Sequence, residues 1–123
     1  MRSFLPLQPV LGSDFPVESP NPWEGIYAAM TRKTPHLDTS ANILPWHPEE
    51  ALTLPQAVAG FTKATARGAF WEGKAGIIQP GAFADWIVLD QSLDEGMGLE
   101  DLRTLRVRET WVAGSRVYHR EDD

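Results

Sequence analysis

The stretch that decides the fold is residues 11–18, LGSDFPVE, which follows directly on the short apolar run PVL at 9–11. The apolar run predicts a buried strand, and Asp14 stands at its exit, so a rigid element would present one carboxylate. Gly12 allows the backbone to turn or to approach a ligand closely. A structural interpretation competes, because Ser-Asp pairs commonly start turns and cap loops. The tripeptide 12–14 taken alone favours that interpretation, and the wider sequence favours the functional one.

The composition excludes several classes of protein. The chain has 123 residues, 42% of them hydrophobic, with a net charge of −6 and no cysteine. Few and scattered basic residues argue against a nucleic-acid or anionic-membrane surface. Prolines interrupt the apolar start of the chain, and no apolar run approaches the roughly 20 residues that span a bilayer. We therefore expect a cytoplasmic protein with no nucleic-acid partner and no membrane association.

A first helix is predicted from Pro22 to about Arg32. Asn21 is a typical N-cap residue, Pro22 suits the first helical position, and Glu24 follows three residues after the cap, as in a capping box. Residues 33–50 then form a long proline-containing loop. Such a loop is either functional or a plain surface excursion, and the sequence leaves both open.

A second helix is predicted to begin after Thr53. Gln56 again stands three residues after the cap, and apolar side chains recur at helical spacing through about Arg67. Gly68 ends or bends this helix, and residues 69–71 could add a further turn.

The last third of the chain reads as strands. Residues 84–90 form a β-branched run of strand length, and residues 96–102 form a loop with one helical turn. Residues 107–112 and 116–119 flank a glycine-containing turn, which predicts a hairpin.

Several short segments follow one another in the order that is typical of one enzyme superfamily. They are GSDFPVE at 12–18, NP at 21–22, GIYAA at 25–29, TR at 31–32, Trp46, PEE at 48–50, LT at 52–53, PG at 80–81, AD at 84–85, VLD at 88–90, and Thr110, Val112, Gly114, Val117 and Tyr118. In these segments the chain resembles the C-terminal portion of the amidohydrolase superfamily, most closely amidohydrolase family 3, the YtcJ-like branch. The resemblance spans about residues 10–119.

The resemblance implies a fold. Members of the family combine a (β/α)8 barrel with a small β-sandwich built from both chain ends, and catalysis takes place at the C-terminal ends of the barrel strands. The implied class is α/β: a C-terminal fragment of a metal-dependent hydrolase barrel, with its last strand and helices, plus part of the composite β-sandwich. Residues 1–75 would be the barrel part and residues 76–123 the sandwich strands.

The same resemblance gives Asp14 a role, as the acid at the end of strand eight. It would be both a metal ligand and a general base, taking a proton from a metal-bound water and returning it to the leaving nitrogen. The implied cofactor is a divalent metal, zinc, in the complete enzyme, with none bound by this chain alone. Asp85 sits at a strand start beside a Pro-Gly pair, so we interpret it as a turn anchor.

Most of the family's metal ligands are missing from the sequence. A His-x-His pair and further histidines are required, whereas the chain has only His36, His47 and His119, with no metal-binding spacing. We expect these three to be solvated or hydrogen-bonded surface residues. A whole barrel needs roughly 250 residues, so only one of its strands would remain here.

Two hypotheses of function follow. The chain is either part of a hydrolase acting on non-peptide carbon–nitrogen bonds of a small amide, carbamate or cyclic imide, incomplete as written, or a noncatalytic remnant or interaction module that retains the family's C-terminal fold. A third possibility, a small ligand-binding module, has only the loop at 33–50 and its Trp46 in its favour.

A barrel fragment should expose surfaces that a barrel would cover. Unpaired strand edges and apolar helix faces invite self-association. We therefore predict that at least one of Trp23, Trp46 and Trp71 is substantially exposed in the monomer.

Overall fold

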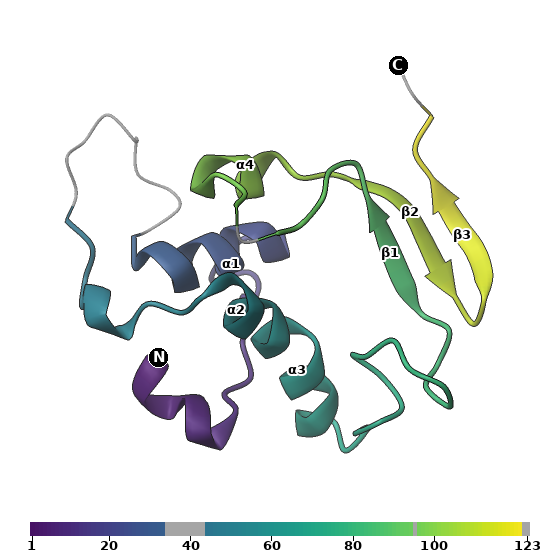
Figure 1. Cartoon of the computed structure of the whole chain (residues 1–123), viewed down its shortest axis with the longest axis horizontal. Helices are drawn as coiled ribbons and strands as arrows, with labels where there is room; N and C mark the ends of the chain where they lie inside the picture. Colours follow the sequence, from purple (N-terminus) through teal and green to yellow (C-terminus); the bar gives the residue numbers. More distant parts are fainter. Residues whose placement is uncertain (34–43, 95, 122–123) are drawn as a thin grey trace.

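The computed structural model describes residues 1–33, 44–94 and 96–121. A group of helices packs together, and a three-stranded sheet stands beside it (Figure 1). The elements in chain order are the 3-10 helix η1 (Arg2–Leu7), α1 (Pro22–Thr31), the 3-10 helix η2 (Pro48–Glu50), α2 (Leu54–Phe61), α3 (Lys63–Gly68), β1 (Trp86–Leu89), α4 (Leu99–Thr104), β2 (Val107–Val112) and β3 (Ser115–His119). The mixed helix-and-strand class predicted from the sequence is confirmed.

Helix α1 begins and ends where the sequence predicted. The side chain of Asn21 accepts a hydrogen bond from the Trp23 N–H at 3.1 Å, and Arg32 closes the helix in the left-handed conformation. The capping box with Glu24 is not formed, because the Asn21 N–H donates to Ser19 Oγ at 3.2 Å. Glu24 instead pairs with Arg103 of α4.

The second predicted helix is divided in two at Thr62. Its start is confirmed, with both hydrogen bonds of the capping box between Thr53 and Gln56 in place. At Thr62 the backbone leaves the helical region (φ −123°, ψ −85°), and its hydroxyl donates to the carbonyl of Val58 at 2.8 Å. Hydroxyl bonding to the carbonyl four residues back often bends a helix, which accounts for the break that apolar spacing alone could not show.

The helical region ends at Gly68, one of the two end points that the sequence allowed. Helix α3 ends at Gly68, as expected, but residues 69–71 do not add a turn. Phe70 adopts a left-handed conformation (φ 61°), which takes the chain out of the helix.

The core lies among the helices. Helix α1 packs against α2 on one side and α4 on the other. Gly25 makes the first contact possible, because a Cβ there would lie 2.4 Å from Phe61 Cζ. The buried side chains of this core come from α1, α2, α4 and their flanks: Trp23, Ile26, Ala29, Leu52, Leu54, Ala57, Leu102 and Leu105.

The sheet confirms the predicted hairpin. Its strands follow the order β1-β2-β3, all antiparallel. Ala113 and Gly114 both have positive φ, as a two-residue hairpin turn requires. Asp85 Oδ1 accepts a hydrogen bond from the Ala113 N–H at 2.8 Å. Asp85 therefore anchors a turn, as predicted, but the turn is that of the hairpin and not one at the neighbouring Pro-Gly pair.

The prediction of a strand at residues 9–11 is wrong. This segment pairs with no strand among the described residues. The Leu11 N–H donates to the carbonyl of Gly60 at 3.1 Å, and Arg67 Nη2 donates to the carbonyls of Leu7 (2.7 Å) and Gln8 (3.2 Å). An apolar run becomes a strand only beside another strand, and here helices α2 and α3 hold its backbone instead.

The prediction of exposed tryptophan is confirmed. Trp46 is 70% and Trp71 53% exposed, whereas Trp23 is buried. The expectation for His36 and most of the loop at 33–50 falls outside the described residues. No helix in the part of the chain that the structure describes is long and apolar enough to cross a membrane.

Candidate functional site

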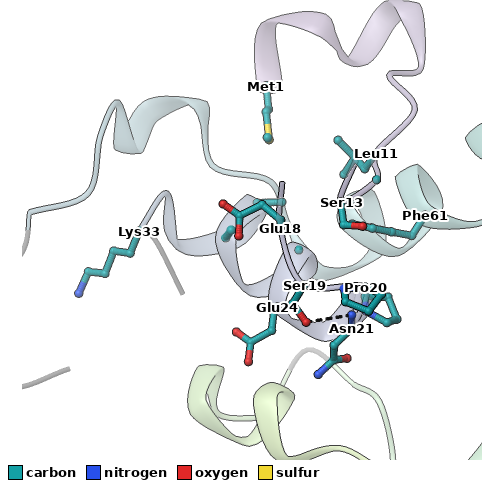
Figure 2. A pocket seen from close by; sticks show the side chains of 15 residues that line it. Met1, Leu11, Ser13, Glu18, Ser19, Pro20, Asn21, Glu24, Lys33 and Phe61 are labelled. Atoms are coloured by element: carbon teal, nitrogen blue, oxygen red, sulfur yellow. Dashed lines mark hydrogen bonds between the residues drawn. The ribbon is translucent and has the colours of Figure 1, made fainter. Parts of the chain in front are cut away.

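A cavity of about 500 Å³ lies beside the segment that the sequence singled out (Figure 2). Its apolar wall includes Leu11, Phe61 and the small residues Ala28 and Ala29 of α1. Polar side chains also line it, namely Ser13, Glu18, Ser19, Asn21, Glu24 and Lys33. Small residues on α1 leave the space open, so the cavity follows directly from the GIYAA sequence at 25–29.

Asp14 stands at the edge of this region rather than inside it. Gly12 and Ser13 line the cavity, whereas Asp14 does not and is exposed. Asp14 has a left-handed backbone (φ 50°), and its carbonyl accepts a hydrogen bond from the Val17 N–H at 2.9 Å. The residue therefore starts a turn, as the structural interpretation predicted.

Several of the polar groups around the cavity are already bonded within the fold or point away from it. Glu24 Oε2 accepts a hydrogen bond from Arg103 Nε at 3.1 Å, so its charge is balanced within the fold. Lys33 points away from the other labelled side chains in Figure 2. Ser19 is engaged by the Asn21 N–H. The cavity therefore has few polar groups available to a ligand, and its wall is mainly apolar.

The Glu24 pair belongs to a polar cluster between α1 and α4. The Tyr27 hydroxyl donates to Glu100 Oε1 at 2.9 Å, and the Arg103 guanidinium lies 5.0 Å from the centre of the Tyr27 ring. Burial, followed by the Glu100 carboxylate, raises the pKa of Tyr27 above its usual value. Arg103, in turn, has its pKa raised by Glu24 and Glu100, against the opposing effect of burial. This cluster joins two helices and contains no group that the sequence had assigned to catalysis.

The described residues do not fit a metal ion by themselves. Nowhere in residues 1–33, 44–94 and 96–121 do three or more His, Asp or Glu side chains come together in a way that could hold one. His47 pairs with Glu49 at 2.6 Å, and His119 lies 3.6 Å from Glu109, both at the surface as predicted.

Comparison with known proteins identifies the family. The sequence model of the amidohydrolase family matches residues 5–118, and the chain belongs to this family. Protein LONG AFTER FAR-RED 3 of Arabidopsis thaliana is 34% identical over 109 residues, which cover 88% of this chain and 17% of that protein. The chain thus spans about one sixth of the length of this curated relative. No solved structure matches this chain.

Sequence reasoning missed the groups that fix this region in space. Glu24 and Arg103 are 79 residues apart in the sequence, so helical spacing could not relate them. Arg67 reaches the backbone of Leu7 across 60 residues. The sequence signals were weak: an acid in the first turn of one helix, and an Arg three residues after Glu100 in another. Such signals fit a solvated helix face equally well.

Proposed function

We propose that this chain is the C-terminal portion of a metal-dependent hydrolase of the YtcJ-like branch, built on a (β/α)8 barrel. Its substrates would be small amides, carbamates or cyclic imides, cleaved at non-peptide carbon–nitrogen bonds. One observation carries the proposal: the family match runs over residues 5–118 and includes the whole stretch around Asp14. That the chain spans 17% of the length of its relative supports a catalytic unit completed by further polypeptide.

In this proposal Asp14 is the catalytic residue contributed by the chain. Its carboxylate accepts a proton from the attacking water and returns it to the leaving nitrogen, while the carbon–nitrogen bond breaks and a carbon–oxygen bond forms. The exposure of Asp14 supports this role, because groups on another part of the enzyme can reach the carboxylate. The metal, zinc in our proposal, would take its remaining ligands from that part.

A second candidate is a noncatalytic module with the same fold. It is favoured by the helical core, which buries Leu102 and its neighbours without further polypeptide, and by the turn that Asp14 adopts. The name of the relative, LONG AFTER FAR-RED 3, refers to far-red and to no reaction. In either case we propose a cytoplasmic protein that self-associates through exposed apolar side chains such as Phe70 and Ile78.

The test combines the chain with the barrel part of another family member. The chain is expressed alone and together with a family member truncated before its own counterpart of residue 5, and zinc content and hydrolysis of an N-acyl amide, a carbamate and a hydantoin are measured. We expect turnover and stoichiometric zinc only in the combined sample. Asp14→Asn should abolish turnover, whereas Glu72→Gln, which removes an exposed carboxylate far along the chain, should not.

Other results would decide against the proposal. Turnover by the chain alone would show that it is a complete enzyme. A combined sample that forms a stable complex but has no activity, or an active Asp14→Asn complex, would remove Asp14 from catalysis and favour the noncatalytic module.

A further inference from the structure

A second hollow, separate from the Asp14 region, lies between the sheet and the start of α1. It is a groove of about 460 Å³. One wall is the sheet face that carries Ile87, Thr110 and Tyr118, and the other is formed by Pro22 and Trp23. The register explains the first wall, because Thr110 lies opposite both Ile87 on β1 and Tyr118 on β3. Of the residues around the Asp14 cavity, only Asn21 and Pro22 also line this groove.

The side chains of the groove have one electrostatic character. Arg106 and Arg120 line it together with the neutral polar residues Asn21, Thr110 and Tyr118, and no carboxylate does. The chain as a whole has a net charge of −6. A groove lined by two arginines and no acid is therefore distinct from the average surface of this protein, and it favours an anionic ligand.

The two arginines have hydrogen-bonding capacity that the described residues do not use. Arg120 Nη2 lies 3.4 Å from Asp90 Oδ2, while its Nη1 is buried without a partner in the described part of the chain. The guanidinium of Arg106 makes no hydrogen bond to any described residue. Arg106 bonds to Asp90 through its backbone alone: its N–H donates to Asp90 Oδ1 at 3.0 Å, and its carbonyl accepts from the Asp90 N–H at 3.1 Å. Asp90 thus offsets one of the two positive charges, and one remains.

The apolar residues of the groove indicate what the uncharged part of the ligand should be. Ile87 and Tyr118 are both about half exposed, and Leu105 and Val107 complete the floor. Pockets for small molecules typically combine such an apolar lining with a few converging polar groups. We infer that this groove binds a small carboxylate with an apolar body: the carboxylate pairs with Arg106 and Arg120, and the apolar body lies over Ile87 and Tyr118. This inference is independent of the proposed hydrolase function.

The experiment compares two probes that share a phenylbutyl body and differ in their head group, an anionic carboxylate or a neutral hydroxyl. 4-Phenylbutyrate and 4-phenylbutan-1-ol are titrated into the isotopically labelled full chain, and amide shifts are followed by NMR. The acid should bind at least about tenfold more tightly than the alcohol, because guanidinium–carboxylate hydrogen bonds are charge-assisted. Its largest shifts should fall at Ile87, Thr110 and Tyr118.

A matched pair of variants separates the groove from net charge. Arg106→Gln should weaken binding of the acid about tenfold and leave binding of the alcohol unchanged. Lys74→Gln makes the same change in net charge on an exposed loop residue outside the groove and should change neither. Arg106 is exposed and its backbone bonds to Asp90 do not involve the side chain, so both variants should fold, which circular dichroism verifies.

Three results would overturn the inference. They are equal affinity for acid and alcohol, the same loss in Arg106→Gln as in Lys74→Gln, and shifts centred on Phe61 in the other cavity.

Discussion

Leu11 contacts Gly60 through both its backbone and its side chain. The carbonyl of Gly60 accepts the hydrogen bond of the Leu11 N–H at 3.1 Å, and a Cβ on Gly60 would lie 2.6 Å from Leu11 Cδ1. The segment that leads to Asp14 is therefore seated on helix α2 at a position where only glycine leaves room. The position of the proposed catalytic carboxylate depends on a residue 46 places further along the chain.

Replacing Gly60 tests this contact, because two effects of opposite sign compete. Alanine is favoured over glycine within a helix by about 1 kcal/mol. Overpacking against Leu11 costs about 1–3 kcal/mol. We expect Gly60→Ala to lower the free energy of unfolding by about 1 kcal/mol in urea denaturation. Gly12→Ala, at a site with nothing within 4 Å, should cause no loss, and a Gly60→Ala variant more stable than wild type would contradict the contact.

The capping box of α2 gives a second prediction. Thr53 Oγ1 accepts from the Gln56 N–H at 3.4 Å, and the Thr53 N–H donates to Gln56 Oε1 at 2.9 Å. Thr53→Ala should lower the free energy of unfolding by about 1 kcal/mol, since a helix N–H loses its acceptor. Thr53→Ser keeps the hydroxyl and should restore most of this stability. Equal stability of the Ala and Ser variants would show that the cap contributes nothing.

The pair between Glu24 and Arg103 should be energetically coupled. Both side chains are about three-quarters buried, and their atoms are 3.1 Å apart. A double-mutant cycle with Glu24→Gln and Arg103→Gln should give a coupling of about 1 kcal/mol in urea denaturation. The pair of Arg103 with the exposed Glu100, at 3.5 Å, should give less than about 0.5 kcal/mol. Equal couplings would mean that burial does not strengthen the first pair.

Tyr27 should make stability fall at high pH. Burial and then the Glu100 carboxylate raise the pKa of Tyr27 above its usual value, so the fold favours the protonated phenol. Its contribution to stability is complete below the pKa of the unfolded chain and is lost as the pH rises from there through the folded pKa. In a Tyr118→Phe variant, which leaves Tyr27 as the one tyrosine of the chain, ultraviolet absorbance should show a midpoint of phenolate formation above that of free tyrosine.

A further variant checks the cause of this shift. Glu100→Gln removes the negative charge but keeps an oxygen acceptor, and it should lower the pKa of Tyr27 part of the way toward the usual value. A midpoint of phenolate formation at or below that of free tyrosine in the Tyr118→Phe protein would contradict the burial of this hydroxyl.

The features that the sequence predicted well are local. Asn21 and Thr53 cap helices through atoms two or three residues away, and the Ala113-Gly114 turn forms its hairpin from adjacent strands. Their geometry depends on neighbours in the chain, so a single sequence contains the necessary information.

The features that it missed depend on distant partners. Residues 9–11 have the composition of a strand, but a strand also needs a neighbour, and the nearest backbone partner of Leu11 belongs to a helix. The break at Thr62 is accompanied by close approach of the later loop, since a Cβ on Gly76 would lie 2.5 Å from the Thr62 carbonyl oxygen. For the candidate site, the sequence predicted the stretch around Asp14 but not the cavity beside it, whose walls meet only after folding. The role of Asp14 stays a prediction.

The stacked indoles of Trp86 and Trp111 make the sheet optically distinguishable from the helices. They face each other across β1 and β2, with ring centres 5.6 Å apart and planes inclined by 21°. We expect two indoles held this closely to couple their electronic transitions, giving a paired positive and negative band in circular dichroism that is lost when the strands separate. Assembly of the hairpin region can therefore be timed against helix formation in one unlabelled sample.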